Sequence, residues 1–154
     1  MSILREIGII ARALDSIANI EFRDLDLARG QYLYLVRIAE QPGMIQEELS
    51  EVLKVDRSTV ARSVKKLEER GLIQQRPRGE NHKIKEWELT EKGKQIYPFI
   101  LGEHLYSETT ALKGFSKEEV AQLEDYLIRV RENIPLDWER VKKGQKRNYS
   151  EVKQ

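Results

Sequence analysis

Apolar residues recur with helical spacing near both ends of the chain. Over residues 3–17 they alternate four and three positions apart, which places them on one face of a helix. A similar stripe runs over residues 120–134, after a predicted capping box of Ser116 and Glu119. Each stripe predicts an amphipathic helix whose apolar face needs a partner. The first stripe contains Ile3, Ile7, Ile10, Leu14 and Ile17, and the second contains Val120, Leu123, Leu127, Val130 and Ile134.

The segment that follows the first stripe predicts two shorter helices. One runs from about residue 28 to 40 and stops before Pro42 and Gly43, because proline cannot continue a helix and glycine allows a turn. The other covers about residues 46–53. Their short length and the tight connection between them predict two helices packed closely together.

The next helix, predicted over residues 57–70, has clear signals at both ends. Asp56 is a good N-cap, because its carboxylate can accept hydrogen bonds from the free amides of the first turn. Gly71 stands where a left-handed residue ends a helix. The buried face is predicted to hold Val60, Val64 and Leu67.

A β-hairpin and a long helix are predicted next. Strands at 72–76 and 84–89 flank a charged loop at 77–83, and alternation along the second strand turns Trp87 toward the core. A further helix over about residues 91–113 follows. Two short helices, a capped basic helix and a hairpin, in that order, are typical of a winged helix-turn-helix: a mainly α fold with a small β-hairpin wing.

Composition narrows the class of protein. The chain has 154 residues, 34% of them charged, and no apolar run approaches the roughly 18–20 residues that span a bilayer. The absence of cysteine excludes disulfides and agrees with a cytoplasmic location. No phosphate-binding loop, dinucleotide fingerprint or nucleophile motif occurs, so we do not expect an enzyme. Two histidines and no cysteine argue against a metal site, and no cofactor is expected.

Charge is unevenly distributed along the chain. The net charge is only +1, but residues 57–83 hold eight basic and three acidic side chains, whereas residues 1–26 hold three basic and five acidic ones. A basic patch on one element is what phosphate binding requires. A solvated helix face is the alternative explanation of the same charges.

The helix over residues 57–70 has the side chains that major-groove binding needs. A groove about 12 Å wide admits one helix, with small or hydrogen-bonding residues at its start and cations to reach bases or phosphates. The first-turn hydroxyls and amides also suit a phosphate, and the basic loop suits a narrow minor groove. The predicted DNA contacts on the helix are Arg57, Ser58, Thr59, Ala61, Arg62, Ser63 and Lys66, and those on the wing are Arg76, Arg78, Asn81, His82 and Lys83.

Four motifs resemble those of the MarR/SlyA family of bacterial transcriptional regulators. They are Asp56-Arg-Ser-Thr-Val-Ala-Arg62, Leu67-Glu-Glu-Arg-Gly-Leu-Ile73, Leu89-Thr-Glu-Lys-Gly93, and Gln31 within Ala28-Arg-Gly-Gln31-Tyr-Leu-Tyr-Leu35. The resemblance covers roughly residues 28–135. It implies a homodimer that binds double-stranded DNA at a palindromic operator, most often as a repressor, and that is often released by a small anionic phenol or carboxylate. A winged helix that binds only proteins is the alternative function.

The resemblance also implies a division of the chain. Residues 1–27 and 94–138 are expected to form the dimer interface, residues 28–93 the DNA-binding lobe, and residues 139–154 a basic disordered tail. The tail can add phosphate contacts or simply favour solubility. In a monomer, the two terminal stripes would instead pack on each other. The predicted dimer contacts are Ile3, Ile7, Ile10, Leu14, Leu123, Leu127 and Val130.

The wing departs from the family pattern at one point. The family wing usually carries Asp-x-Arg eight residues before the Leu-Thr pair, where this chain has Asn81-His82-Lys83. An Asp–Arg pair fixes a bidentate fork, whereas lysine is a flexible point charge. We therefore expect a more mobile wing with weaker minor-groove contacts.

The effector is the least specified partner. Aromatic side chains at helical spacing can line a ligand pocket, but they more often belong to an ordinary core. The candidates are Tyr32, Tyr34, Tyr97, Phe99 and His104.

Overall fold

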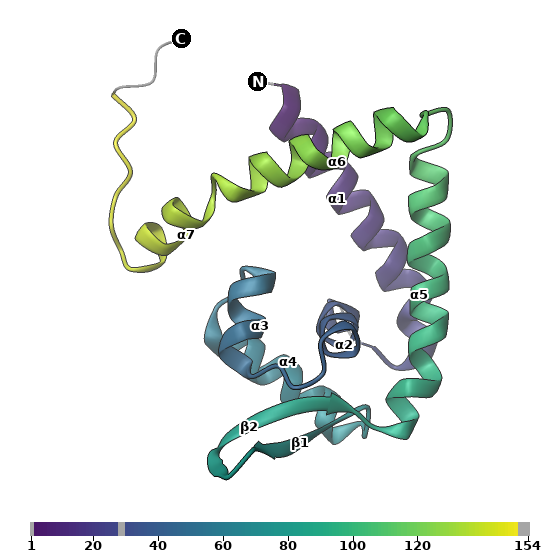
Figure 1. Ribbon diagram of the computed structural model, residues 1–154, viewed down its shortest axis with the longest axis vertical. Helices are drawn as coiled ribbons and strands as arrows, with labels where there is room; N and C mark the ends of the chain where they lie inside the picture. The colour runs from purple at the N-terminus through teal and green to yellow at the C-terminus, as the bar shows by residue number, and fades with distance from the viewer. Residues whose placement is uncertain (1, 28–29, 151–154) are drawn as a thin grey trace. The chain divides into compact units, whose positions relative to one another are not determined.

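The computed structural model describes residues 2–27 and 30–150 (Figure 1). The chain divides into two compact units, one up to Thr109 and the other from Thr110. The first unit contains the helices α1 (Ser2–Glu21), α2 (Gln31–Glu40), α3 (Gln46–Leu53) and α4 (Arg57–Glu69), the 3-10 turn η1 (Phe22–Leu25), the strands β1 (Ile73–Arg78) and β2 (Asn81–Leu89), and most of α5 (Glu91–Ala111). The second contains α6 (Lys117–Glu132) and α7 (Pro135–Lys142).

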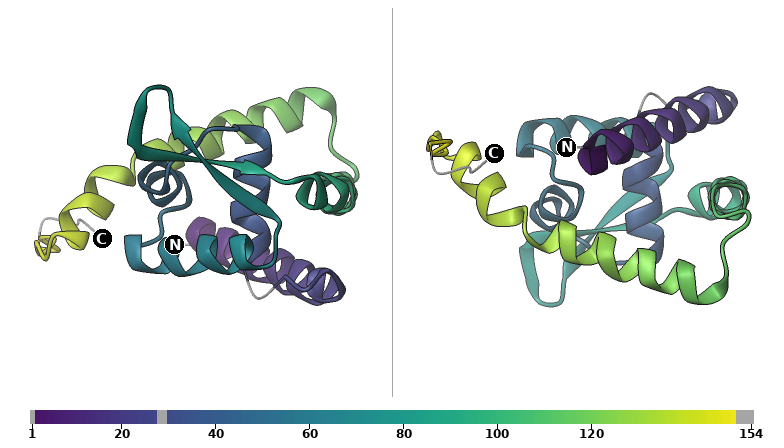
Figure 2. Two further views of the ribbon diagram at one scale, coloured as in Figure 1. Left: turned by 90° about the horizontal axis from the view of Figure 1, so that it is seen from below. Right: turned by 90° about the horizontal axis from the view of Figure 1, so that it is seen from above.

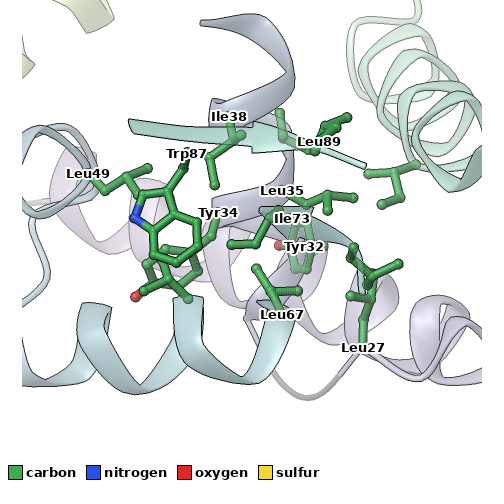
Figure 3. Packing of buried hydrophobic residues seen from close by; sticks show 14 of the residues in the cluster. Leu27, Tyr32, Tyr34, Leu35, Ile38, Leu49, Leu67, Ile73, Trp87 and Leu89 are labelled. Atoms are coloured by element: carbon green, nitrogen blue, oxygen red, sulfur yellow. The ribbon is translucent and has the colours of Figure 1, made fainter. Parts of the chain in front are cut away.

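The core of the first unit is built around α2, which packs against α3, α4 and β2. Figure 3 shows Trp87 of β2 beside Leu49 of α3 and Tyr34 of α2. Trp87 is only 2% exposed, and its amide donates to the Met44 carbonyl at 2.8 Å. The prediction that Trp87 anchors the hairpin to the core is confirmed.

Helix α4 follows the sequence prediction at both ends. The Asp56 carboxylate accepts from the Thr59 amide at 2.9 Å, and Gly71 has a φ of 71°. The Leu72 amide then bonds to the Leu67 carbonyl at 3.0 Å, which completes the C-terminal cap. Val60, Val64 and Leu67 are buried, as predicted.

The hairpin is longer than predicted. Its strands pair from Ile73 opposite Leu89 to Arg78 opposite Asn81, so most of the predicted loop 77–83 belongs to the strands. The difference arises because Gly79, with a φ of 53°, permits a tight turn. A register shift lies between Pro77 and Arg78, and the closed end lies on the side of α3 (Figures 1 and 2).

Glycine at position 93 lets the start of α5 lie against Leu72, in the turn between α4 and β1. A β carbon on Gly93 would come 2.2 Å from the carbonyl oxygen of Leu72, which is closer than atoms can approach. Thr90 caps the helix by accepting from the Gly93 amide at 3.1 Å and donates to the Gly71 carbonyl. The Leu89-Thr-Glu-Lys-Gly93 motif therefore joins α5 to the hairpin and α4.

The second unit contains a helix that the sequence analysis missed. The capping box of α6 is confirmed, with the Glu119 amide donating to Ser116 Oγ at 3.1 Å and the Ser116 amide donating to Glu119 at 2.7 Å. Helix α7 includes residues 139–142, so the prediction that the disordered tail begins at residue 139 is wrong. Pro135 stands at the start of this helix, where its fixed φ is favourable. Residues 145–149 have no regular secondary structure, and the last tail residues, 151–154, lie outside the described residues.

The predicted apolar stripes are largely uncovered in the single chain. On α1, Ile3 is 68% and Ile10 is 54% exposed, Leu14 is exposed and Ile7 is partly buried. On α6, Leu127 is exposed, and Leu123 and Val130 are partly buried. No helix in the described part of the chain is long and apolar enough to cross a membrane.

Candidate nucleic-acid interface

The outward face of α4 carries the side chains that were predicted to contact DNA. Arg57, Ser58, Arg62 and Lys66 are exposed, whereas Thr59, Ala61 and Ser63 are partly buried. The buried face packs on α2 and α3, so the polar face of α4 is left toward solvent. Amphipathic periodicity was sufficient to predict this orientation.

Asp56 organises the first turn of α4. Its carboxylate accepts from Ser58 Oγ at 2.6 Å, from Thr59 Oγ1 at 2.7 Å and from the Thr59 amide. The hydrogen bonds from Ser58 and Thr59 stabilise the charged form and hold the pKa of Asp56 well below its usual range. The Thr59 amide, one of the first-turn amides predicted to suit a phosphate, therefore donates to the carboxylate of Asp56 in this structure.

The two arginines of α4 have exposed partners. Arg57 Nη2 lies 2.5 Å from Glu47 Oε1 of α3, with side chains 79% and 61% exposed, and Arg62 Nη2 donates to Thr59 Oγ1 at 3.1 Å. Exposed ion pairs contribute little free energy, because water screens both charges. Both guanidinium groups can therefore exchange their present partners for phosphates or bases.

The two arginines of β1 are paired with carboxylates. Arg76 donates from Nε to Glu86 at 3.1 Å and from Nη1 to Glu88 at 2.8 Å. Arg78 donates from Nε to Glu86 at 2.9 Å, and its Nη2 lies 3.3 Å from both Glu48 Oε1 and the Gly43 carbonyl oxygen. Arg78 and Arg76 lower the pKa of Glu86, and the hydrogen bonds to Glu86 and Glu48 raise the pKa of Arg78.

These carboxylates are functional groups that the sequence analysis missed. The basic segment of residues 57–83 leaves out Glu86 and Glu88, which follow it closely, and Glu48, which lies well before it. Glu86 holds Arg78 from the opposite strand. This pair concerns a different cation from Lys83, so the predicted mobility of the wing at Asn81-His82-Lys83 stays a prediction. The sequence pattern that could have predicted these ion pairs is the alternation of Arg76 and Arg78 along the first strand and of Glu86 and Glu88 along the second. Lys83 is exposed; the side chains of Asn81 and His82 lie outside the described residues.

Three of the five aromatic candidates lie around the ring of Phe22, and the other two lie elsewhere. The Phe22 ring lies 5.1 Å from Tyr32, 6.1 Å from Phe99 and 6.3 Å from His104, measured between ring centroids. Burial raises the pKa of Tyr32, as does the hydrogen bond that its hydroxyl donates to Asp15. Tyr34 instead belongs to the core beside Trp87, and Tyr97 lines a separate hollow of about 490 Å³ with Ile38, Pro42 and Leu89.

A metal site needs several ligand side chains close together, and the described residues offer no such cluster. Nowhere among them do three His, Cys, Asp or Glu side chains gather closely enough to hold a metal ion.

The chain is similar in sequence to bacterial regulators. The MarR family model matches residues 27–85. The uncharacterized HTH-type transcriptional regulator YybA of Bacillus subtilis (strain 168) is 61% identical over 147 residues, which cover 96% of this chain and 98% of that protein. A second regulator from that strain, YwoH, is 30% identical over 76% of this chain and 85% of its own length.

Solved structures agree in fold with these sequence matches. A putative MarR family transcriptional regulator from Listeria monocytogenes, crystallised with a 26mer DNA, is 55% identical with a TM-score of 0.91, over 95% of this chain and 97% of that one. A crystal structure of the transcriptional regulator SlyA is 57% identical with a TM-score of 0.85, over 92% and 99% of the two chains. The fold and the four sequence motifs thus lead to one identification: this chain belongs to the MarR family of transcriptional regulators.

Proposed function

We propose that this protein is a homodimeric repressor that binds an inverted-repeat operator in double-stranded DNA. The observation that carries the proposal is the outward face of α4, where Arg57, Ser58, Arg62 and Lys66 are exposed on a helix held by its opposite face. The relative from Listeria monocytogenes that was crystallised with DNA supports the same role. In this proposal, α4 enters the major groove and the hairpin lies along the neighbouring minor groove.

Two observations support α4 as the reading helix. Its exposed arginines have weak partners, so few stabilising contacts are lost when DNA replaces them. Its length of 13 residues gives about 20 Å, at 1.5 Å per residue, which is enough to place several side chains along a groove.

The exposed apolar face of α1 supports a dimer. Side chains such as Ile3 and Ile10 are more than half exposed, and a second copy of the chain would remove them from water. Two-fold symmetry would then place two α4 helices about 34 Å apart, one turn of DNA, and an inverted repeat matches that symmetry.

Deleting residues 3–17 tests the dimer. We expect the truncated chain to become monomeric or to aggregate, because the deletion removes most of the exposed stripe. Light scattering after size-exclusion chromatography measures the molar mass of the truncated protein and so distinguishes a monomer from a dimer. A soluble dimer that still binds the operator would refute the assigned interface.

Release by a small phenol or carboxylate is the remaining part of the proposal. The partly buried ring of His104, whose centroid lies 5.7 Å from that of Tyr32, is the aromatic candidate that could offer an edge contact to a ligand. A thermal-shift screen of small phenols and carboxylates, followed by displacement of bound DNA, tests it. A compound that raises the melting temperature and lowers DNA affinity supports release; a complete screen without such a compound counts against it.

DNA binding itself is tested with the full chain and genomic fragments that include its own upstream region. We expect a selected fragment with an inverted repeat and an affinity that falls steeply as salt rises, because each phosphate contact releases a counterion. Binding to no fragment, or a salt slope near zero, contradicts the proposal and favours a winged helix that binds proteins.

A further inference from the structure

Arg78 lies where the hairpin meets the helix-turn-helix. Its Nε donates to Glu86 of β2 at 2.9 Å, and its Nη2 lies 3.3 Å from Glu48 of α3. The same nitrogen lies 3.3 Å from the carbonyl oxygen of Gly43, in the turn before α3. One guanidinium group therefore joins a strand, a helix and a turn.

The acceptors around Arg78 are themselves held in place. The Glu86 side chain is only 16% exposed and also accepts from Arg76. Glu48 belongs to the first turn of α3, where its other oxygen lies 3.4 Å from the Ile45 amide that it caps. A planar guanidinium suits such divergent acceptors, because its donors point in fixed directions.

Other anchors of the hairpin lie at its open end. Trp87 and Leu89 are buried, whereas none of the residues 74–80 is buried. Arg76 pairs with Glu86 and Glu88, which are both on β2, so these pairs do not tie the hairpin to another element. The contacts of Arg78 with Glu48 and Gly43 do so near the closed end.

We propose that Arg78 is a positioning residue that clamps the closed end of the hairpin onto α3 and thereby sets the angle between the wing and the reading helix α4. Helix α3 packs directly on α4, so a tie to α3 is a tie to the reading helix. The proposal rests on the proposed DNA binding and changes the role of Arg78 within it. Arg78 acts through Glu48 and Glu86, while Lys83 stays the wing cation that meets the phosphates.

Salt dependence separates positioning from phosphate contact. We expect Arg78→Ala and Arg78→Lys both to weaken operator binding, by about tenfold, with the salt slope of the wild type, because neither loses a phosphate contact and lysine cannot bridge three acceptors. Lys83→Ala is the contrasting variant and should flatten the slope by about 1. The clamp is wrong if Arg78→Ala flattens the slope and Arg78→Lys restores both slope and affinity.

Glu48→Gln gives a test of opposite sign. Removing a negative charge near DNA should strengthen binding by simple electrostatics, whereas loss of the clamp should weaken it. Glu51→Gln removes the same charge one turn along α3, where Glu51 pairs with Lys54. We expect weaker binding for Glu48→Gln and no weakening for Glu51→Gln. Equal or tighter binding by Glu48→Gln overturns the proposal.

Amide hydrogen exchange in the DNA-free protein tests the clamp independently of DNA binding. Arg78→Ala and Glu48→Gln should speed exchange in residues 76–86, whereas Arg76→Ala, which loses pairs confined to the hairpin, should leave exchange in the closed end close to wild type. An equal effect of Arg76→Ala contradicts a clamp onto α3. If the wild type binds no DNA, the proposed function fails, and hydrogen exchange still decides whether Arg78 holds the hairpin.

Discussion

Helix α4 and the hairpin both carry cations, but they hold them differently. On α4, Arg57 pairs with Glu47 through side chains 79% and 61% exposed. On the hairpin, Arg76 and Arg78 share Glu86, whose side chain is 16% exposed. Separating the hairpin pairs therefore leaves a less hydrated carboxylate without its partners.

The difference shows that the net charge of a sequence segment does not give the charge that its side chains present to a ligand, because some of them are paired with carboxylates from other segments. The local excess of positive charge over residues 57–83 predicted a basic patch. The structure divides it into helix α4, whose arginines have exposed and exchangeable partners, and a hairpin whose arginines are paired with Glu86, Glu88 and Glu48. We therefore expect substitutions in the two regions to have different effects.

The largest effect should come from the buried end of the hairpin. Trp87→Ala should lower the free energy of unfolding by about 3–5 kcal/mol, because it leaves a cavity between β2 and the helices. Chemical denaturation followed by circular dichroism measures it. Lys85→Ala, an exposed position on the same strand, should change it by less than about 0.5 kcal/mol. A loss below about 1 kcal/mol for Trp87→Ala would show that the hairpin is not anchored through its core residue.

Gly93→Ala tests the junction between the two regions. The added methyl would overlap the Leu72 carbonyl at 2.2 Å, so we expect a loss of about 1–3 kcal/mol in unfolding free energy. Gly102→Ala, on the same helix with open space around the new methyl group, should instead gain about 0.5–1 kcal/mol. Thermal or urea unfolding of both variants measures the contrast. Similar values for the two would argue against the close approach.

Asp56→Ala tests the capped start of α4 and should have a smaller effect. Because folding lowers the pKa of Asp56, its carboxylate stabilises the folded protein at pH values above its ordinary pKa of 3.8. This stability is lost as the pH falls through the pKa that Asp56 has in the folded protein. The variant should melt below wild type at neutral pH, with a difference that shrinks in acid. Asp56→Asn keeps a cap acceptor and should lose less. Melting temperatures across the pH range measure both, and a pH-independent difference for Asp56→Ala would contradict this account.

The sequence allowed α4 to be predicted almost completely, because its determinants are local. Asp56 caps an amide three residues away, Gly71 ends the helix, and the buried residues follow from periodicity. The capping box of α6 was predictable for the same reason.

Other features depend on residues far apart in the sequence. Arg78 meets Glu86 eight residues away and Glu48 thirty residues away, and neither pairing follows from local charge. The length of the hairpin depended on the conformation of Gly79. Helix α7 was not predicted, because the basic residues from position 139 onward indicated a disordered tail. The apolar stripe of α1 predicted a face that the single chain leaves exposed, but a stripe does not specify its partner.

The affinity of Arg62→Ala for the selected operator tests the central claim most directly. Arg62 lies on the outward face of α4, and its only described hydrogen bond is to Thr59 on the same helix, so its loss should leave the fold intact. Fluorescence anisotropy should show specific binding weakened by about 1–3 kcal/mol, with relaxed preference at one base pair of each half-site. Unchanged operator affinity in the folded variant would contradict the assignment of α4 as the reading helix.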